Sequence, residues 1–268
     1  MAQYSVSRGR HYHANANRDL HEVVMIADED GNIINTFGAA SNVIISAGDL
    51  AGYAGVHKYG AVFGTASSGW STVWTAANTS ASALYPWSIA ANTITVVSSS
   101  GSDTGGITIQ GLDTDYNFIE ETLTLTGTTP VAGSTTFLRV NRAFMNDNTN
   151  IGKIQVKNGT TVVTEIAAGY GQTLQCFYTV PAGKTGYMLN IHASASKNQE
   201  TILALFVRPF GGAFRAQLTQ SLYQNNQQLD FPVPLRFTEK SDIDFRVNGS
   251  SNSTISGDFS IILVDNES

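Results

Sequence analysis

The chain has 268 residues, of which 42% are hydrophobic and only 13% charged, and its formal net charge is −6. Average proteins carry about 25% charged residues, so an unusually uncharged surface is expected. The negative net charge argues against a general nucleic-acid-binding protein, because phosphate backbones select for clustered lysine and arginine. No run of 18 apolar residues occurs, so no transmembrane helix is predicted. The single cysteine, Cys176, excludes an intrachain disulfide and fits a reducing cytoplasm.

Residues 1–22 are predicted to form an extended N-terminal arm, since they show no sustained apolar period and lack the apolar core of a signal peptide. Three roles remain open for this arm: it is solvated, it contacts a neighbouring subunit, or it contacts phosphate groups. A metal site is a further alternative, because alternate residues of an extended chain share one side, but nothing in the sequence fixes its geometry. The expected capsid or subunit contacts are Arg8, Arg10, His11, His13 and Arg18, and the metal ligands would be His11 and His13 with His21 or Asp19.

An Asp-Gly turn between two apolar runs predicts a β-hairpin over Val23–Ala27 and Ile33–Phe37. Residues 28–32 also resemble the start of a calcium loop, but Ala39 stands where the bidentate glutamate belongs. The turn 113–117 fails the same test at Phe118 and Thr124. Both segments are therefore interpreted as turns.

Residues 38–92 are rich in small residues and contain all three tryptophans, Trp70, Trp74 and Trp87. Aromatic side chains in such a segment form either a stacking platform for sugars or hydrophobic plugs that hold long loops against a sheet. The plug is favoured because each large ring buries a substantial area. The same three tryptophans remain the candidate glycan contacts.

The rest of the chain predicts strands, and no segment shows a helical period or an internal repeat. Asn158-Gly159 lies between two strand-type runs and favours a type I′ hairpin turn. The two prolines of Asp230–Phe237 confine that strand to an edge. Further strands are expected at Thr93–Val97, Gly106–Gln110, Glu120–Thr126, Thr136–Phe144, Ile154–Lys157, Thr161–Ile166, Phe214–Tyr223, Asp242–Val247 and Ile255–Val264.

The stretch Tyr170–Phe210 is predicted to form three consecutive strands of one meander, over Gln172–Val180, Thr185–His192 and Thr201–Arg208. About eight strands follow residue 148, a number that suits a jelly-roll-like sandwich. The predicted fold class is therefore all-β, an antiparallel β-sandwich. The expected division is an arm at 1–22, a first β-domain at 23–148 and a jelly-roll-like domain at 149–268.

The familiar catalytic motifs are absent from the sequence, including the nucleophile elbow, the P-loop, the dinucleotide fingerprint and the zinc-protease helix. A Cys176–His192 pair is conceivable if their strands are neighbours. Burial between apolar residues would however raise the thiol pKa, the reverse of what a nucleophile needs. No cofactor and no enzymatic activity are therefore predicted.

Four segments resemble virion structural proteins of tailed bacteriophages, notably marine phages of cyanobacteria. They are SRGRHYHANANRDLHEVVMIADEDGNIINTFGAASN near the N-terminus, RVNRAFMN at 139–146, AAGYGQTLQCFYTVPAGKTGY at 167–187 and EKSDIDFRV with FSIILVDN at the end. The resemblance covers nearly the whole chain and is weakest at 60–105. It implies a particle component that is assembled in the host cytoplasm, and it carries over no catalytic residue.

Three functional interpretations follow. The first is a capsid decoration or cement protein on the head exterior, a homotrimer that contacts the major capsid protein or other virion proteins through many weak contacts. The second is a tail-associated or fibre-tip protein that contacts host-surface glycans. The third, a polysaccharide hydrolase or a free carbohydrate-binding module, is the least favoured. The first interpretation involves neither nucleic acid nor membrane.

Overall fold

In a computed structural model, the chain divides into two units, residues 1–54 and 55–268. Each is described by itself. Side chains are described from residue 42 onward, except that of Tyr223. The residues that the structure describes are 12–14, 20–22, 26–27, 33–34, 39–63, 69–77, 83–87, 90–196, 200–223, 226–249 and 254–266.

The first unit contains two short strand pairs and a helix. Strand β1 (Tyr12–Ala14) pairs with β2 (Leu20–Glu22), and β3 (Ile26–Ala27) pairs with β4 (Ile33–Ile34). The second pair agrees with the hairpin predicted around the Asp-Gly turn, whose turn residues lie outside the described part of the chain.

The helix α1 (Ala39–Ala47) was not predicted. It ends in a Schellman motif: Gly48, with φ of 79°, donates to the Ile45 carbonyl, and Asp49 donates to the Ile44 carbonyl. The many small residues conceal a helical period, whereas the glycine that follows the last turn was a usable signal. No helix in the described part of the chain has the length and hydrophobicity needed to cross a bilayer.

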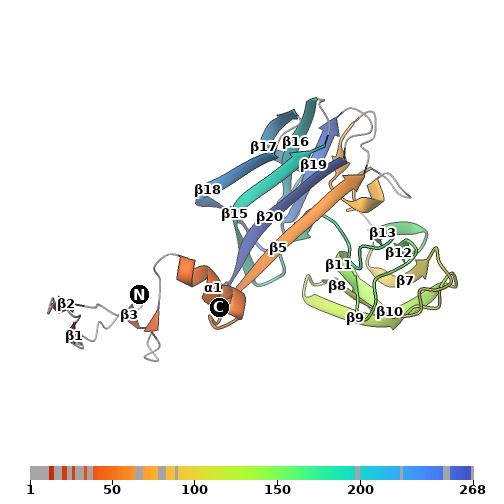
Figure 1. Cartoon of the computed structure of the whole chain (residues 1–268), viewed down its shortest axis with the longest axis horizontal. Coiled ribbons are helices and arrows are strands. Elements are labelled where there is room, and N and C mark those ends of the chain that lie inside the picture. The colour runs from red at the N-terminus through yellow and green to blue at the C-terminus, as the bar shows by residue number, and fades with distance from the viewer. Residues whose placement is uncertain are drawn as a thin grey trace. The chain divides into compact units, whose positions relative to one another are not determined.

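The second unit is built on two antiparallel sheets that face each other. The first sheet has the order β18-β15-β20-β5, as Figure 1 shows. In β15 and β20, buried residues that are mostly apolar alternate with more exposed ones, as expected for a sheet with one face on the core. The bounds of these strands are Asn226–Phe237 for β18, Lys184–Ala195 for β15, Thr254–Asp265 for β20 and Tyr53–Phe63 for β5.

The second sheet has the order β14-β19-β16-β17, and the short strand β6 (Ser71–Thr72) also pairs with β19. Taken along the chain, the eight main strands place the first, eighth, third and sixth in one sheet and the second, seventh, fourth and fifth in the other. This is the jelly-roll arrangement, so the predicted fold class is confirmed. The bounds are Phe177–Thr179 for β14, Asp242–Gly249 for β19, Glu200–Arg208 for β16 and Arg215–Tyr223 for β17.

The predicted meander of Tyr170–Phe210 is wrong in its pairing. β15 pairs with β18 and β20, whereas β14 and β16 both pair with β19 in the other sheet. The three strands β14, β15 and β16 therefore alternate between the two sheets. β18 lies at an edge, as its prolines required, and its ladder with β15 is interrupted around Pro232 and Pro234, between Asp230 and Leu235.

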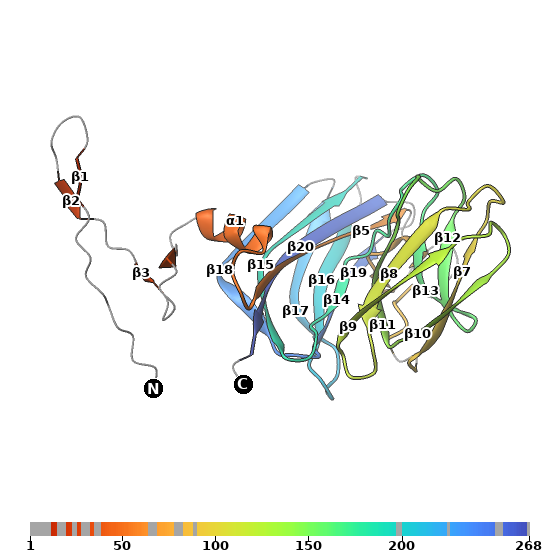
Figure 2. The same cartoon turned by 90° about the horizontal axis from the view of Figure 1, so that it is seen from below.

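A second, smaller sandwich is inserted between β5 and β14. One sheet has the order β10-β7-β12-β13 and the other β11-β8-β9, and these strands form a separate group in Figure 2. Their shared core contains Ile94, Ile109, Phe137, Val156 and Val163. The bounds are Asn92–Ser98 for β7, Gly106–Leu112 for β8, Phe118–Thr124 for β9, Val131–Phe137 for β10, Arg139–Met145 for β11, Ile154–Asn158 for β12 and Thr161–Ile166 for β13.

The expected boundary between two β-domains at residue 148 does not agree with how the strands pair. The hairpin β12–β13 belongs to the inserted sandwich, because Gln155 and Val156 lie opposite Val97 and Val96 of β7. β5, which precedes that boundary, belongs to the jelly roll. The single strand predicted over Thr136–Phe144 is two strands, with a corner at Leu138.

Candidate binding face on the first sheet

The outer face of the first jelly-roll sheet carries rows of polar side chains that cross neighbouring strands. Strand alternation produces them: in β20, residues 255, 257, 259, 261 and 263 are buried, and the residues between them point outward. The register places His192 of β15 opposite both Asp258 of β20 and Gln228 of β18. His57 of β5 extends this row on the other side of Asp258.

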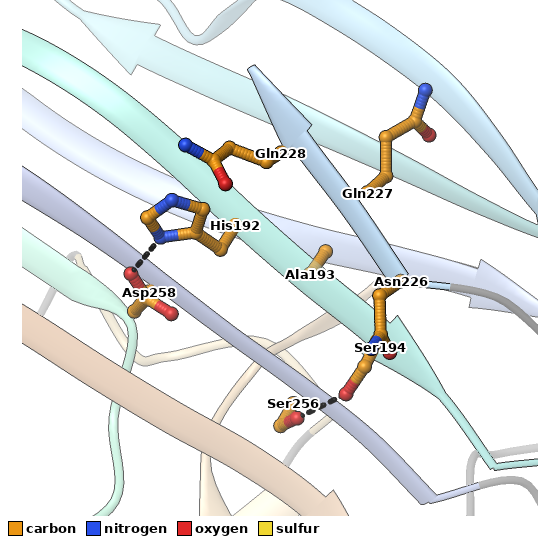
Figure 3. Close-up of a pocket in the computed structure, with 8 residues that line it drawn as sticks. All are labelled: His192, Ala193, Ser194, Asn226, Gln227, Gln228, Ser256 and Asp258. Carbon is orange, nitrogen blue, oxygen red and sulfur yellow. Dashed lines mark hydrogen bonds and ion pairs between the residues drawn. The ribbon is translucent and has the colours of Figure 1, made fainter. Parts of the chain in front are cut away.

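Asp258 is the centre of this row. His192 Nδ1 lies 2.7 Å from Asp258 Oδ1, and His57 Nε2 lies 3.3 Å from the same oxygen. In the next row the hydroxyls of Ser194 and Ser256 are hydrogen-bonded at 2.6 Å. Figure 3 shows the His192–Asp258 and Ser194–Ser256 pairs side by side on neighbouring strands.

These rows line a hollow of about 480 Å³. Its lining consists almost entirely of amides, hydroxyls, an imidazole and a carboxylate, which donate and accept hydrogen bonds without presenting a large apolar surface. Such a surface suits a polar, hydroxyl-rich ligand or a polar subunit contact. Among the residues whose side chains are described, no group of three or more His, Cys, Asp or Glu could hold a metal ion. The lining residues are His192, Ala193, Ser194, Asn226, Gln227, Gln228, Ser256 and Asp258.

The tryptophans predicted as possible glycan contacts lie elsewhere. Trp74 and Trp87 are 1% and 7% exposed, so neither presents a ring face to a sugar. Both pack edge-on against Tyr85 and Phe177. Trp70 is half-buried and packs edge-on against Phe206. The plug interpretation therefore describes Trp74 and Trp87.

Trp87 also belongs to a buried polar network. Its Nε1 donates to Asp244 Oδ2 at 2.9 Å, and Arg246 Nε donates to the same oxygen at 2.7 Å. Burial raises the pKa of Asp244, while Arg246 and the hydrogen bond from Trp87 act in the opposite direction. A network of this kind holds the core together and is closed to a ligand.

A buried ion pair joins the inserted sandwich to the jelly roll. Arg139 of β11 donates through Nε to Asp242 Oδ1 of β19 at 3.2 Å, and both side chains are 4% exposed. Arg208 and Thr179 also donate to this carboxylate. The guanidinium of Arg139 lies 5.4 Å from the centre of the Trp87 ring.

The predicted arm residues cannot be placed in a site. Arg8, Arg10, His11 and Arg18 lie outside the described residues. The backbone of His13 lies in β1 opposite His21, and nothing is described of either side chain.

The other candidates from the sequence have structural roles. Asp113 Oδ1 accepts the N–H groups of Asp115 and Asn117, so this carboxylate caps the turn that was predicted here. Cys176 is fully buried, and burial raises the pKa of its thiol well above the ordinary value. It lies beside β14 in the second sheet, whereas His192 lies in the first, so the two do not form a pair.

Comparisons with known proteins add little. No family model matches the chain, and no curated protein matches it. Among solved structures, it is similar to the VP2 subviral particle of infectious bursal disease virus at 11% identity and a TM-score of 0.21, covering 66% of this chain and 56% of that one. The structure of the Gx strain of the same virus matches at 9% identity and a TM-score of 0.23, covering 80% and 72%. TM-scores this low do not establish a shared fold, and the strand order remains the evidence for the jelly roll.

Proposed function

We propose that this protein is a structural component of a tailed-phage virion, most specifically a decoration or cement protein on the exterior of the head. The observation that carries the proposal is the strand order of the two sheets, a jelly roll with an inserted β-sandwich. Jelly rolls are widely used as capsid and lectin domains. The sequence segments that resemble virion proteins support the same role.

The composition and the sheet edges fit an assembled protein. With only 13% charged residues, the chain presents a surface suited to close contact with neighbours. β17 ends one sheet and contains no proline, and no described strand pairs with its outer edge, which therefore offers backbone groups to another strand. The proposal includes a homotrimer attached to the major capsid protein through the arm residues. It requires no cofactor and no catalytic step.

Immunogold electron microscopy of intact particles tests the location, with an antibody against residues 170–265. Even labelling over the head is the expected result. Label confined to the tail or its tip would replace the decoration role by the tail role described next. Particles without label would contradict both the decoration role and the tail role, and would favour a free binding module.

The alternative is a tail-associated or fibre-tip protein that contacts host glycans. One observation favours it: the polar rows around His192 and Asp258 provide the hydrogen-bonding groups that a sugar needs, on a face that is open to solvent. In this alternative the glycan contacts are these side chains and exclude the buried Trp74 and Trp87.

A further inference from the structure

A second cleft lies between β5 of the jelly roll and the inserted sandwich, with a volume of about 420 Å³. Its walls bring together segments that are far apart in the sequence, β5 on one side and β8, β9 and β11 on the other. None of the described residues that line it is an aspartate or glutamate. The chain as a whole has a net charge of −6, whereas this cleft is lined by cationic and neutral side chains. The residues that matter here are Lys58, Tyr59, Phe118, Asn141, Arg142 and Gln172.

Lys58 is the buried charge of this cleft. It is 8% exposed, and its Nζ donates to the backbone carbonyl of Asn141 at 2.5 Å. An ammonium group has three donors, and no carboxylate of the cleft lining is present to balance its charge. Burial lowers the pKa of Lys58 to about 8. The positive charge of Arg142 lowers this pKa further, whereas Cys176 acts to raise it. Burying a charge without a counter-ion is unfavourable, so an anionic ligand would relieve a cost that the folded protein already carries.

Asn141 provides a second sign of an absent partner. Its side chain is 7% exposed, and its Oδ1 has no hydrogen-bond partner. Leaving a buried acceptor unpaired is unfavourable, so such groups usually indicate a missing donor. Asn141 lines the cleft, so an occupant that carries a hydroxyl group would supply this donor. A simple carboxylate or a fully ionised phosphate has no hydrogen to donate.

The cleft is also lined by a second cationic side chain, Arg142, and by two aromatic residues. Arg142 is exposed, and its Nη2 donates to Gln172 Oε1 at 2.9 Å, which holds the guanidinium at the cleft. Phe118 and Tyr59 are 59% and 45% exposed, which is high for large aromatic side chains that line a cleft. Exposed rings of this kind provide flat apolar faces beside the polar groups.

We propose that this cleft binds an acidic saccharide, a sugar unit that carries a carboxylate. The carboxylate lies at Lys58 and Arg142, a sugar hydroxyl donates to Asn141 Oδ1, and the C–H face of the ring lies against Phe118 or Tyr59. A neutral sugar lacks the charge that Lys58 requires, and an inorganic anion lacks both the hydroxyl donor and the apolar face. The inference concerns the isolated chain and does not depend on whether the protein lies on the head or the tail.

Isothermal titration of the purified full chain tests this directly, with sodium glucuronate, glucose and inorganic phosphate as probes. Glucuronate should bind at least tenfold more tightly than either of the other two. Equal affinity for glucose would overturn the role of the charge, and equal affinity for phosphate would reduce the cleft to a general anion site. The titration uses millimolar protein and about a 50-fold molar excess of glucuronate, so that weak binding is still detected. If no binding of glucuronate is measured under these conditions, the proposal is overturned.

Variants locate the binding within the molecule. Lys58→Met should lower the affinity for glucuronate at least tenfold, because it removes the buried cation. Arg142→Gln lies at the exposed rim and should fold normally, so its expected weakening of several-fold tests the cleft even if the buried variant is unstable. Lys157→Met on β12 makes the same change at a lysine that does not line the cleft, and it is the matched control. This variant should bind glucuronate as the unchanged protein does, and a loss equal to that of Lys58→Met would contradict the site.

The pH dependence gives an independent readout. The pKa of Lys58 is about 8, so the unliganded cleft loses its buried charge as the pH rises through that value. Glucuronate affinity should therefore be lower at pH 10 than at pH 7 in the unchanged protein, by tenfold or more. In Lys58→Met the residual affinity should change much less over this range. An affinity that is the same at both pH values in the unchanged protein would exclude Lys58 as the binding cation.

Discussion

Asp103 shows how one buried carboxylate fixes two loops of the inserted sandwich. Its oxygens accept hydrogen bonds from the Ser98 hydroxyl and from the N–H groups of Ile151 and Gly152. Burial alone would raise the pKa of Asp103, but these hydrogen bonds outweigh it and lower the pKa below its ordinary 3.8. The charged form is therefore the one that the fold stabilises.

Replacing Asp103 by asparagine should lower the free energy of unfolding by about 2 kcal/mol at pH 7, because the amide nitrogen that replaces one carboxylate oxygen cannot accept an N–H group. A carboxyl group whose pKa is lowered on folding contributes fully above its unfolded value and loses that contribution as the pH falls through its folded value. The difference between the two proteins should thus shrink below pH 4. Urea unfolding at pH 7, 5 and 3 measures it. Asp115→Asn, in an exposed turn, is the control, and a difference that stays constant with pH would show that charge is not the cause.

Trp74 and Trp87 are expected to act on stability and not on binding. Trp74→Ala or Trp87→Ala should cost about 3–5 kcal/mol, because each leaves a large cavity among packed aromatic rings. Trp87→Ala also removes a donor from the Asp244 carboxylate. Trp70→Ala is the matched control and should cost less, since Trp70 is only half-buried. Chemical unfolding gives the stability, and loss of glycan binding with unchanged stability would contradict the plug role.

The type of a residue and its sequence neighbours predicted some of the buried side chains and missed others. Burial of Trp74, Trp87 and Cys176 agrees with the prediction from their size or from the apolar residues around them. Lys58 and Asn141 carried no signal, because the strand pattern of β5 gives no reason to bury a lysine. Lys58 donates to the carbonyl of Asn141 in the inserted sandwich, a contact between residues 83 positions apart in the chain, and the local sequence carries no trace of it.

At the scale of elements, the Asp242 carboxylate is the joint between the two sandwiches. Asp242→Ala would leave Arg139 and Arg208 without their acceptor in a buried site, so we expect a loss of about 3–5 kcal/mol. Asp265 accepts from Lys184 at the surface, and Asp265→Ala should cost less than about 1 kcal/mol. Urea unfolding compares the two variants. Equal losses would mean that the buried pair contributes no more than an exposed one.

Strands were easier to predict than their partners. The alternation in Asp242–Val247, the turn at Asn158-Gly159 and the prolines of β18 are local signals, and each marked a real strand, turn or edge. Pairing is not local: β15 lies between β18 and β20, both of which come much later in the chain. Periodicity tells which face of a strand is buried but says nothing about which strand lies beside it. This is why the meander was wrong although its strands exist.

At the scale of the whole molecule, the arm is predicted to attach the protein to its shell. Deleting residues 1–22 should weaken attachment while leaving the jelly roll folded, because none of the eight main strands lies before residue 53. Co-sedimentation with undecorated heads measures attachment, and circular dichroism measures folding. Full-length protein is the control. A truncated protein that fails to fold would make the arm part of the core.

The strand order also sets the sequence of events during synthesis. β5 must wait for its neighbour β20, which the ribosome delivers roughly 200 residues later, about 10–40 s at ordinary elongation rates. The inserted sandwich, whose strands all fall between residues 92 and 166, has its partners within reach long before that. It should therefore fold first, on the nascent chain, while β5 remains an exposed strand with unpaired edges. Until β20 arrives, this strand is the segment most open to aggregation, and a chaperone that acts on the emerging protein would be expected to hold it.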